Sequence, residues 1–167
     1  MAEFKELIRP TQVIMITTRA NIEIMGKEQE KDNMLPIAWH CPLSSDPGRY
    51  IITMGEKKFS YKLIKKSGVF CINFVSPELQ KEVYFAGTNS GEMIDKFKET
   101  GLTKEECSTI DCPRIKEAIS YMECEVFKEE NIDGHMFIIG KVSNIEKNAD
   151  AKKLFNYSKE KYTTTVD

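Results

Sequence analysis

Two long strand-like runs, ISYMECEVFKEE (residues 119–130) and HMFIIGKVSNIEK (residues 135–147), are joined by the short segment NIDG. Both runs are rich in β-branched and aromatic residues, which favour extended backbone. Asp133-Gly134 is typical of a tight hairpin turn, because both residue types tolerate a positive φ. The stretch therefore predicts a long antiparallel hairpin and a fold that is mainly β.

Three shorter segments that precede this hairpin in the sequence also predict strands: TQVIMITT (11–18), YIITMG (50–55) and VFCINF (69–74). Residues 33–43 are extended but interrupted by proline, which predicts an edge or bulged strand. Residues 21–32 are charged and contain Gly26, so we expect an exposed hairpin loop there. Strands separated by tight turns, with only short helices, indicate a closed antiparallel barrel rather than a doubly wound parallel sheet.

Helical patterns are short. SYKLIKKSG predicts a helix with Ser60 as N-cap and Gly68 beyond its end, and SPELQKEVYFAG predicts another that begins at Ser76-Pro77. A third short helix is expected at about residues 94–99, followed by an irregular stretch. The tail ADAKKLFNYSKEKY (149–162) begins with a helical pattern.

Bulk composition limits the class of protein. A length of 167 residues fits one domain, and 24 basic against 26 acidic residues argue against a general nucleic-acid binder. No apolar run is long enough to span a membrane, and MAEFKELIRP does not resemble a secretory signal. The chain has five cysteines and no CxxC pair, so we expect reduced thiols in a cytoplasmic protein, with Cys71 and Cys124 as core residues.

Common catalytic motifs are absent: the sequence has no GxGxxG after a strand, no GxxxxGK[ST], no HExxH and no GxSxG. Cys41 with His135 is a conceivable nucleophilic pair, whereas His40 and Cys41 are neighbours on a strand and point to opposite faces. The two histidines and three cysteines are a conceivable zinc set without ligand spacing. Core roles are the better interpretation, and we predict no metal.

The segment NMLPIAWHCPLSSDPGRY (33–50) concentrates scarce residues: the only tryptophan, Trp39, then His40 and Cys41, and three of the six prolines. Proline prevents full pairing of such a strand, which leaves other backbone groups free to bond the edge of a planar heterocycle. The alternative is that Trp39 fills a core gap and SSDP is a plain turn.

Three other positions suit ligand binding. Lys58 and Ser60 stand at a predicted helix start, where unpaired N–H groups and a lysine can hold a phosphate. Lys96 follows the glycine-bracketed loop GTNSG, and His135 follows the hairpin turn. The alternatives are a solvated basic turn, a surface charge pair and a structural histidine.

Together these segments, with KxS before LIKKSGVFCINF, GTNSGEMIDKF and ECEVF…DGHMFIIGKV, resemble the flavin reductase-like family, close to the flavoredoxins. The resemblance runs from about residue 10 to residue 142. It implies a single domain over residues 1–167 with a mainly β, Greek-key-like split β-barrel that binds FMN. It also implies a homodimer.

By this resemblance the cofactor contacts are Asn33, Trp39, His40, Cys41, Pro42, Leu43 and Ser44 along the ring, Thr53, Lys58, Phe59 and Ser60 at the ribityl chain and phosphate, and Lys96 and His135, the catalytic pair, near the isoalloxazine. The family often has Pro-Pro where this chain has Pro47-Gly48, and arginine in place of Lys58. Lysine binds phosphate as a point charge, without bidentate geometry.

The implied activity is NAD(P)H-dependent reduction of flavin or ferric complexes, with hydride passing to flavin N5. NADH or NADPH is the implied donor, and free flavin, a ferric complex or a redox protein the acceptor. One alternative is an FMN-containing electron carrier without nicotinamide activity of its own. Another is a barrel that binds a different cofactor, such as haem, or none. No cysteine is expected to serve redox turnover, because no partnered thiolate is visible in the sequence.

Overall fold

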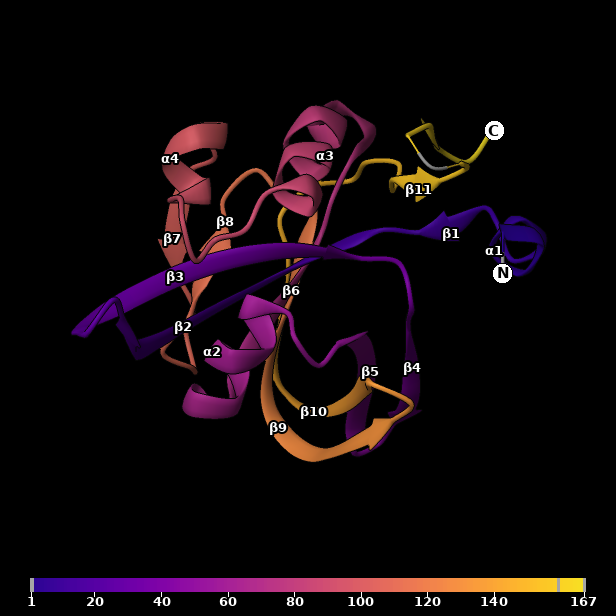
Figure 1. Cartoon of the computed structure of the whole chain (residues 1–167). Coiled ribbons are helices and arrows are strands. Elements are labelled where there is room, and N and C mark those ends of the chain that lie inside the picture. The colour runs from indigo at the N-terminus through magenta and orange to yellow at the C-terminus, as the bar shows by residue number, and fades with distance from the viewer. Residues whose placement is uncertain (1, 159, 167) are drawn as a thin grey trace.

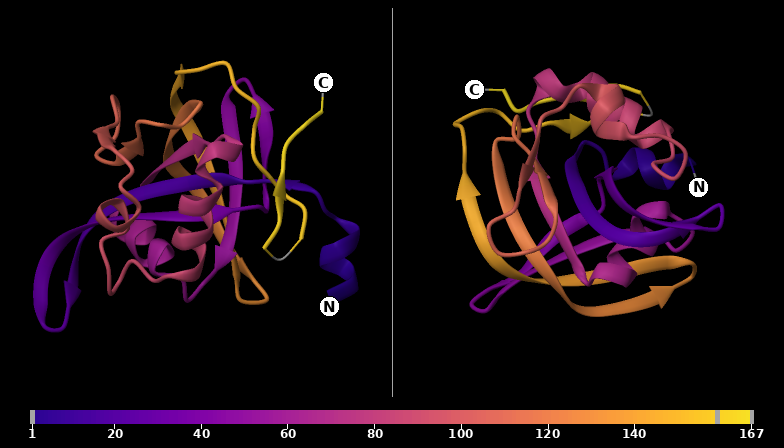
Figure 2. Two further views of the ribbon diagram at one scale, coloured as in Figure 1. Left: turned by 90° about the horizontal axis from the view of Figure 1, so that it is seen from above. Right: turned by 90° about the vertical axis from the view of Figure 1, so that its left-hand side faces the viewer.

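The body of the molecule is a seven-stranded antiparallel sheet with the strand order β3-β2-β6-β9-β10-β5-β4. The computed structural model describes residues 2–158 and 160–166. The sheet contains β2 (Ile14–Ile24), β3 (Lys27–Ile37), β4 (His40–Ser45), β5 (Gly48–Gly55), β6 (Val69–Phe74), β9 (Ser120–Ile132) and β10 (His135–Lys147). It curls around the core as a split β-barrel (Figures 1 and 2), as the sequence predicted. Its two edge strands, β3 and β4, are consecutive in the chain.

Short elements cover the barrel. The helices are α1 (Ala2–Leu7), α2 (Phe59–Ser67), α3 (Gln80–Thr88) and α4 (Lys96–Thr100), with a 3-10 turn at Pro77–Leu79. Two small sheets contain β1 (Thr11–Gln12), β11 (Phe155–Asn156) and β12 (Tyr162–Thr163), and β7 (Lys104–Glu106) with β8 (Pro113–Ile115). Within residues 2–158 and 160–166, no helix combines the length and apolar character needed to cross a bilayer.

The predicted hairpin is confirmed as β9 and β10, which pair from His135↔Ile132 to Lys147↔Ser120. Asp133 and Gly134 both have positive φ, 50° and 79°, as a tight turn of this kind requires. Two register shifts, at Ile139/Gly140 and Val142/Asn144, interrupt the ladder. Bulges bend strands and increase their twist, which lets two such long strands wrap around the core.

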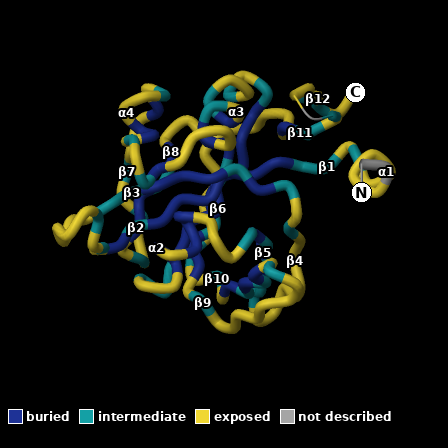
Figure 3. Tube along the Cα trace, viewed as in Figure 1, coloured by how far each residue is buried: buried dark blue, intermediate teal, exposed yellow. Residues whose placement is uncertain are grey.

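Successive side chains along the central strands point to opposite faces of the sheet, and each face packs into its own hydrophobic core. Ile14 and Ile16 of β2 pack inside the barrel with Phe70, whereas Met15 points to the opposite face and packs beside Val83 of α3. Figure 3 shows these strands as the buried centre of the molecule. Each fully buried large side chain contributes about 1.5–3 kcal/mol, so both faces of the sheet stabilise the fold.

Two segments differ from the sequence prediction. Residues 21–32 are the outer ends of β2 and β3 with a turn at Met25-Gly26, rather than a loop, because the backbone ladder continues beyond the point where side chains reach the core. In the tail, the described residues 149–158 contain β11 and no helix, and β12 begins at Tyr162. Leu154 explains this: its side chain is fully buried, its carbonyl accepts from Val13 N (2.9 Å), and its N–H donates to Val75 O (2.9 Å).

Smaller corrections concern the helices and the stretch after α4. Ser60 is not the N-cap of α2; Lys58 occupies that position with extended backbone, and Gly68 ends the helix in the left-handed conformation as predicted. The stretch expected to be irregular contains the β7–β8 pair. Cys71 and Cys124 are fully buried, as predicted.

Candidate functional site

A cavity of about 240 Å³ lies between β3, the turn into α2, and the loop from α3 to α4. Five of the residues predicted from sequence meet there: Asn33, Lys58, Phe59, Ser60 and Lys96. The rest of the lining is Leu35, Lys57, Gly87, Thr88, Asn89, Ser90 and Gly91. Sequence reasoning missed Leu35 and the side chains of the TNS loop, for which the two bracketing glycines were the available signal.

Asn33 has an unsatisfied buried oxygen at this cavity. Its side-chain amide donates to Ser60 Oγ (2.8 Å), and both residues are only 2% exposed. Its Oδ1 atom accepts no hydrogen bond from the residues that the structure describes. A buried acceptor without a donor costs about 1–3 kcal/mol. A bound hydroxyl or N–H group would remove that cost.

Gly91 allows the α3–α4 loop to approach Asn33 closely. A Cβ atom placed on Gly91 would lie 2.0 Å from Asn33 Oδ1 and 2.6 Å from its Cγ. No side chain fits at that distance unless the loop or the Asn33 side chain moves. The cavity wall is therefore set by backbone rather than by a movable side chain.

Lys96 is the buried cation of the cavity, although it begins a helix. Its side chain is bent inward, where Nζ donates to Met34 O (2.9 Å) and Ala86 O (2.6 Å). These bonds use two of the three ammonium protons. Burial, and then the nearby charge of Lys58, lowers the pKa of Lys96 to about 8. An anion between the two lysines would stabilise both charges.

The first turn of α2 adds to this positive environment. Lys58 precedes the helix, and no side chain caps the N-terminus among the described residues. The unpaired N–H groups of a nine-residue helix attract anions together with the helix dipole. An anion site in the cavity is therefore formed by the first turn of α2 together with Lys58 and Lys96.

Trp39, Thr53 and His135 form a second group at the edge of the barrel. Thr53 donates to Trp39 O through both its N–H (3.0 Å) and its hydroxyl (3.2 Å). The Trp39 and His135 rings have centroids 5.9 Å apart. His135 pairs with Gly55, whose carbonyl accepts from Lys58 N (3.0 Å), so β5 connects this group to the cavity.

The remaining predicted residues lie elsewhere on β4. The His40 ring contacts Tyr50 Oη (2.7 Å) and Gln12 O (3.0 Å), and burial lowers its pKa. Cys41 is exposed. Pro42, Leu43 and Ser44 line a separate open hollow of about 760 Å³, shared with residues of β5 and β10.

Catalysis by a Cys41–His135 pair has no support in the contacts of these residues. The Cys41 residue is exposed on β4, whereas the His135 ring lies beside the Trp39 ring. In the part of the chain that the structure describes, no three His, Cys, Asp or Glu side chains are placed to hold a metal ion.

Comparison with known proteins adds independent findings. A family model described as "Flavin reductase like domain" matches residues 8–165. An uncharacterized protein of Archaeoglobus fulgidus is 33% identical over 116 residues, which are 70% of this chain and 66% of that protein. The chain thus spans just under two thirds of that relative.

Solved structures share the fold at low sequence identity. An FMN-binding protein from Thermus thermophilus superposes with a TM-score of 0.82 at 20% identity, over 95% of this chain and 88% of that one. Flavoredoxin of Desulfovibrio vulgaris superposes with a TM-score of 0.81 at 19% identity, over the same shares of the two chains.

Proposed function

The chain belongs to the flavin reductase-like family, and from that membership we propose that it is an FMN-dependent oxidoreductase that draws electrons from NADH or NADPH. Electrons would pass on to free flavin, a ferric complex or a redox protein. The observation that carries the cofactor assignment is a cavity lined by Lys58, Lys96, the start of α2 and Asn33, whose side-chain oxygen is buried without a hydrogen-bond partner among the described residues.

The phosphate of FMN fits the positive end of this cavity. Burial, and then the charge of Lys58, lowers the pKa of Lys96, and a phosphate between the two lysines would oppose that effect. The first N–H groups of α2 would donate to the same oxygens. Ser60, whose hydroxyl accepts from Asn33, has its own proton to offer.

The ribityl chain accounts for the Asn33 oxygen. Hydroxyl groups along that chain are donors, and Asn33 Oδ1 needs one. A cavity of about 240 Å³ is too small for the whole cofactor, so the ring would lie outside it. Phe59 is buried beside Ser60 and supports this wall.

The isoalloxazine would lie against the barrel edge. Trp39 is 40% exposed and offers an aromatic surface beside Thr53 and His135, and the backbone from His40 to Ser44 offers donors and acceptors. When bound, FMN supplies two-electron chemistry at N5. His135, from β10, is the proposed catalytic residue beside the ring: a donor group there stabilises negative charge that develops on the flavin. Lys96, expected from the resemblance to act with it, lies in the cavity with Lys58 and is assigned to the phosphate instead.

Binding is tested by titrating the flavin-free protein with FMN and with riboflavin, which lacks the phosphate. We expect Lys58→Ala to weaken FMN binding by roughly 10- to 150-fold, the equivalent of about 1.5–3 kcal/mol for a charge-assisted hydrogen bond, and to leave riboflavin binding nearly unchanged. Lys65→Ala, an exposed lysine in the last turn of the same helix, is the matched control. Equal losses for both flavins would refute the phosphate site.

Turnover is tested by adding NADH or NADPH to the FMN-loaded protein without oxygen and following the visible absorption of the flavin. We expect one of the two nucleotides to bleach it. If the protein binds FMN and neither nucleotide bleaches it, the reductase is excluded and an electron carrier remains.

We also propose that two copies of the chain associate. Leu43 and Ile145 are large apolar side chains, 49% and 65% exposed, and both line the open hollow beside β4. Apolar side chains gathered around one hollow mark a surface that a partner covers.

A further inference from the structure

Three of the five cysteines converge at a place outside the proposed flavin site. Cys71 is in the middle of β6, Cys107 follows β7, and Cys112 precedes β8. Cys71 and Cys112 belong to one buried cluster, and Cys107 packs against it. None of the three lines the cavity with Lys58 and Lys96. The cluster has no part in the function proposed above, so any chemistry it performs is separate.

Cys107 and Cys112 are opposite each other in the β7–β8 hairpin. The register of that pair ends at Glu106↔Pro113, and the next pair along is Cys107 and Cys112. Cys107 N donates to Cys112 O at 3.0 Å, which confirms that the two backbones are adjacent. Opposed residues of antiparallel strands have Cα atoms about 4.5–5.5 Å apart, within the range that a disulfide spans.

The surroundings of Cys107 favour its thiolate. Hydrogen bonds from the Cys112 and Cys71 thiols, opposed by burial and Glu123 and aided by Arg114, lower the pKa of Cys107 to about 5. Burial, and then the thiolate of Cys107, raises the pKa of Cys112 well above its usual value. One sulfur is therefore a nucleophile at neutral pH, while its neighbour holds a proton.

The loop that carries Cys107 is partly open yet fixed in place. Cys107 is half-buried, whereas Cys71 and Cys112 are fully buried. The carboxylate of Glu123 accepts from Ser108 N (2.8 Å) and from Thr109 N (2.6 Å), directly after Cys107. A reactive, accessible thiol beside a resolving cysteine is the arrangement found in redox-sensing proteins.

We propose that Cys107 is oxidised reversibly by hydroperoxides and that Cys112 is its resolving thiol. The Cys107 thiolate attacks the peroxide; an S–O bond forms, the O–O bond breaks, and the leaving oxygen takes a proton to become water or an alcohol. Cys112 sulfur then attacks the sulfenic acid; an S–S bond forms and the S–O bond breaks. The hydroxide leaves as water with the Cys112 proton. Two thiols lose two electrons, and the peroxide gains them.

The first step prepares the second. Burial is the main cause that raises the pKa of Cys112, and the charge of Cys107 adds to it; oxidation of Cys107 removes that second cause. The loss therefore makes Cys112 more nucleophilic at the moment it is needed. A small hydroperoxide also suits the site better than a bulky disulfide, because Cys107 is only half-exposed.

The test treats the protein, as purified, with one equivalent of hydrogen peroxide, blocks the remaining thiols, and maps the peptides by mass spectrometry. We expect two thiols lost per chain and a Cys107–Cys112 disulfide. In Cys112→Ala, dimedone should trap a sulfenic acid at Cys107. In Cys107→Ser, Cys71 and Cys112 should stay reduced at the same dose.

Cys41 is the matched control because it is exposed and outside the cluster. Cys107 should react roughly tenfold or more faster than Cys41 in the wild-type protein, since only the thiolate is nucleophilic. The proposal is overturned if Cys107→Ser consumes peroxide as fast as the wild type, if Cys41 is modified first, or if the disulfide joins Cys107 to Cys71. The wild-type mapping decides the matter even where a variant fails to fold.

Discussion

Lys96 has the most informative charge in the molecule, because a buried ammonium held by two backbone carbonyls is sensitive to whatever binds beside it. Its pKa of about 8 lies well below that of a free lysine, near 10.4. Below about pH 8 the group is charged and attracts an anion, and above it the charge is lost. Anion binding raises this pKa, so protons are taken up on binding at alkaline pH.

We therefore expect wild-type FMN affinity to fall as the pH rises from about 7 to about 9. Lys96→Met, of similar length without charge, should bind roughly 10- to 150-fold more weakly at about pH 7 and show no such fall. Fluorescence titrations at several pH values measure both effects. If the FMN affinity of the wild type stays constant from about pH 7 to about pH 9, the charge of Lys96 does not contribute to binding and its role is structural.

The position of His40 in the sequence does not show which groups its ring contacts in the fold. Its place beside Trp39 in a proline-rich strand predicts a ligand contact, and because Tyr50 and Gln12 hold its ring, the backbone is the part of His40 left for that contact. Strand alternation told us that His40 and Cys41 face opposite ways, but not which side faces the core. Lys58, Ser60 and Lys96 are brought to one cavity by the fold, a proximity that spacing alone could not establish.

At the scale of elements, the α3–α4 loop depends on one close approach. Gly91→Ala places a methyl group 2.0 Å from Asn33 Oδ1, so the loop or the Asn33 side chain must move. Overpacking of this kind costs about 1–3 kcal/mol. We expect Gly91→Ala to lower the free energy of unfolding by that amount in denaturant titrations.

A double-mutant cycle with Asn33→Ala identifies the cause. With the Asn33 amide removed, the alanine at position 91 has room, and its cost should fall to nearly zero. If Gly91→Ala costs the same in both backgrounds, the strain lies in the loop backbone and the cavity wall is not set by this contact.

Elements with a local signal were predictable, and those that depend on distant partners were not. Asp133-Gly134 fixes the β9–β10 turn through its own backbone preferences, and Gly68 ends α2 for the same reason. The tail had a helical pattern, but Leu154 is taken into the core by Val13 and Val75, more than 70 positions away in sequence. Tertiary contacts of that kind override local propensity.

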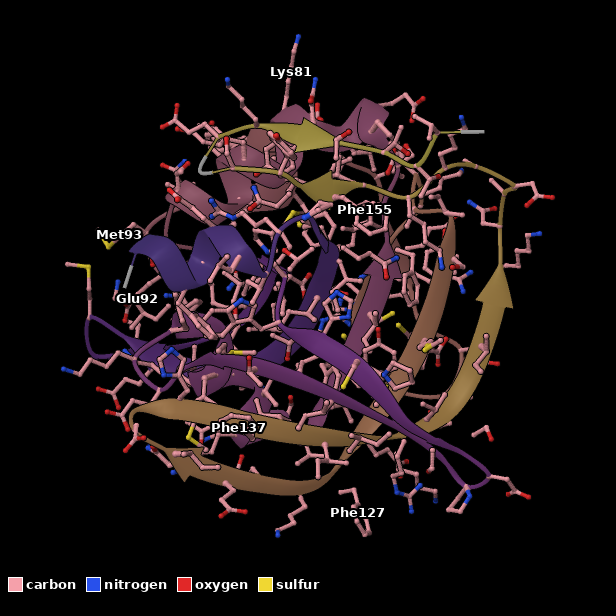
Figure 4. The ribbon with its side chains drawn as sticks, turned by 90° about the vertical axis from the view of Figure 1, so that its right-hand side faces the viewer. Lys81, Glu92, Met93, Phe127, Phe137 and Phe155 are labelled. Carbon is pink, nitrogen blue, oxygen red and sulfur yellow. The ribbon has the colours of Figure 1, made fainter. Side chains whose placement is uncertain are left out.

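At the scale of the whole molecule, the exposed apolar surface beside β4 predicts self-association. Phe127 points outward from the barrel (Figure 4), with Arg49 stacked over its ring at 4.4 Å, and Leu43 and Ile145 line the nearby hollow. We expect the wild type to sediment as a dimer and Leu43→Asp to shift it towards the monomer, because a buried charge is costly.

Leu7→Asp is the control, since Leu7 is also an exposed leucine, 84% against 49% for Leu43, but lies on α1, outside the hollow. It should leave the sedimentation of the protein unchanged. A wild type that sediments as a single chain at micromolar concentration would rule out the association.

The hydrogen bond from Lys96 to Met34 joins residues 62 positions apart in the chain. During synthesis from the N-terminus, Asn33, Lys58 and Ser60 leave the ribosome well before Lys96 does, and the anion site is incomplete until then. The chain can therefore bind the cofactor only late in its synthesis and folding. A ligand that binds only the finished fold stabilises that fold by mass action, so the supply of flavin in the cell would set how many new chains persist.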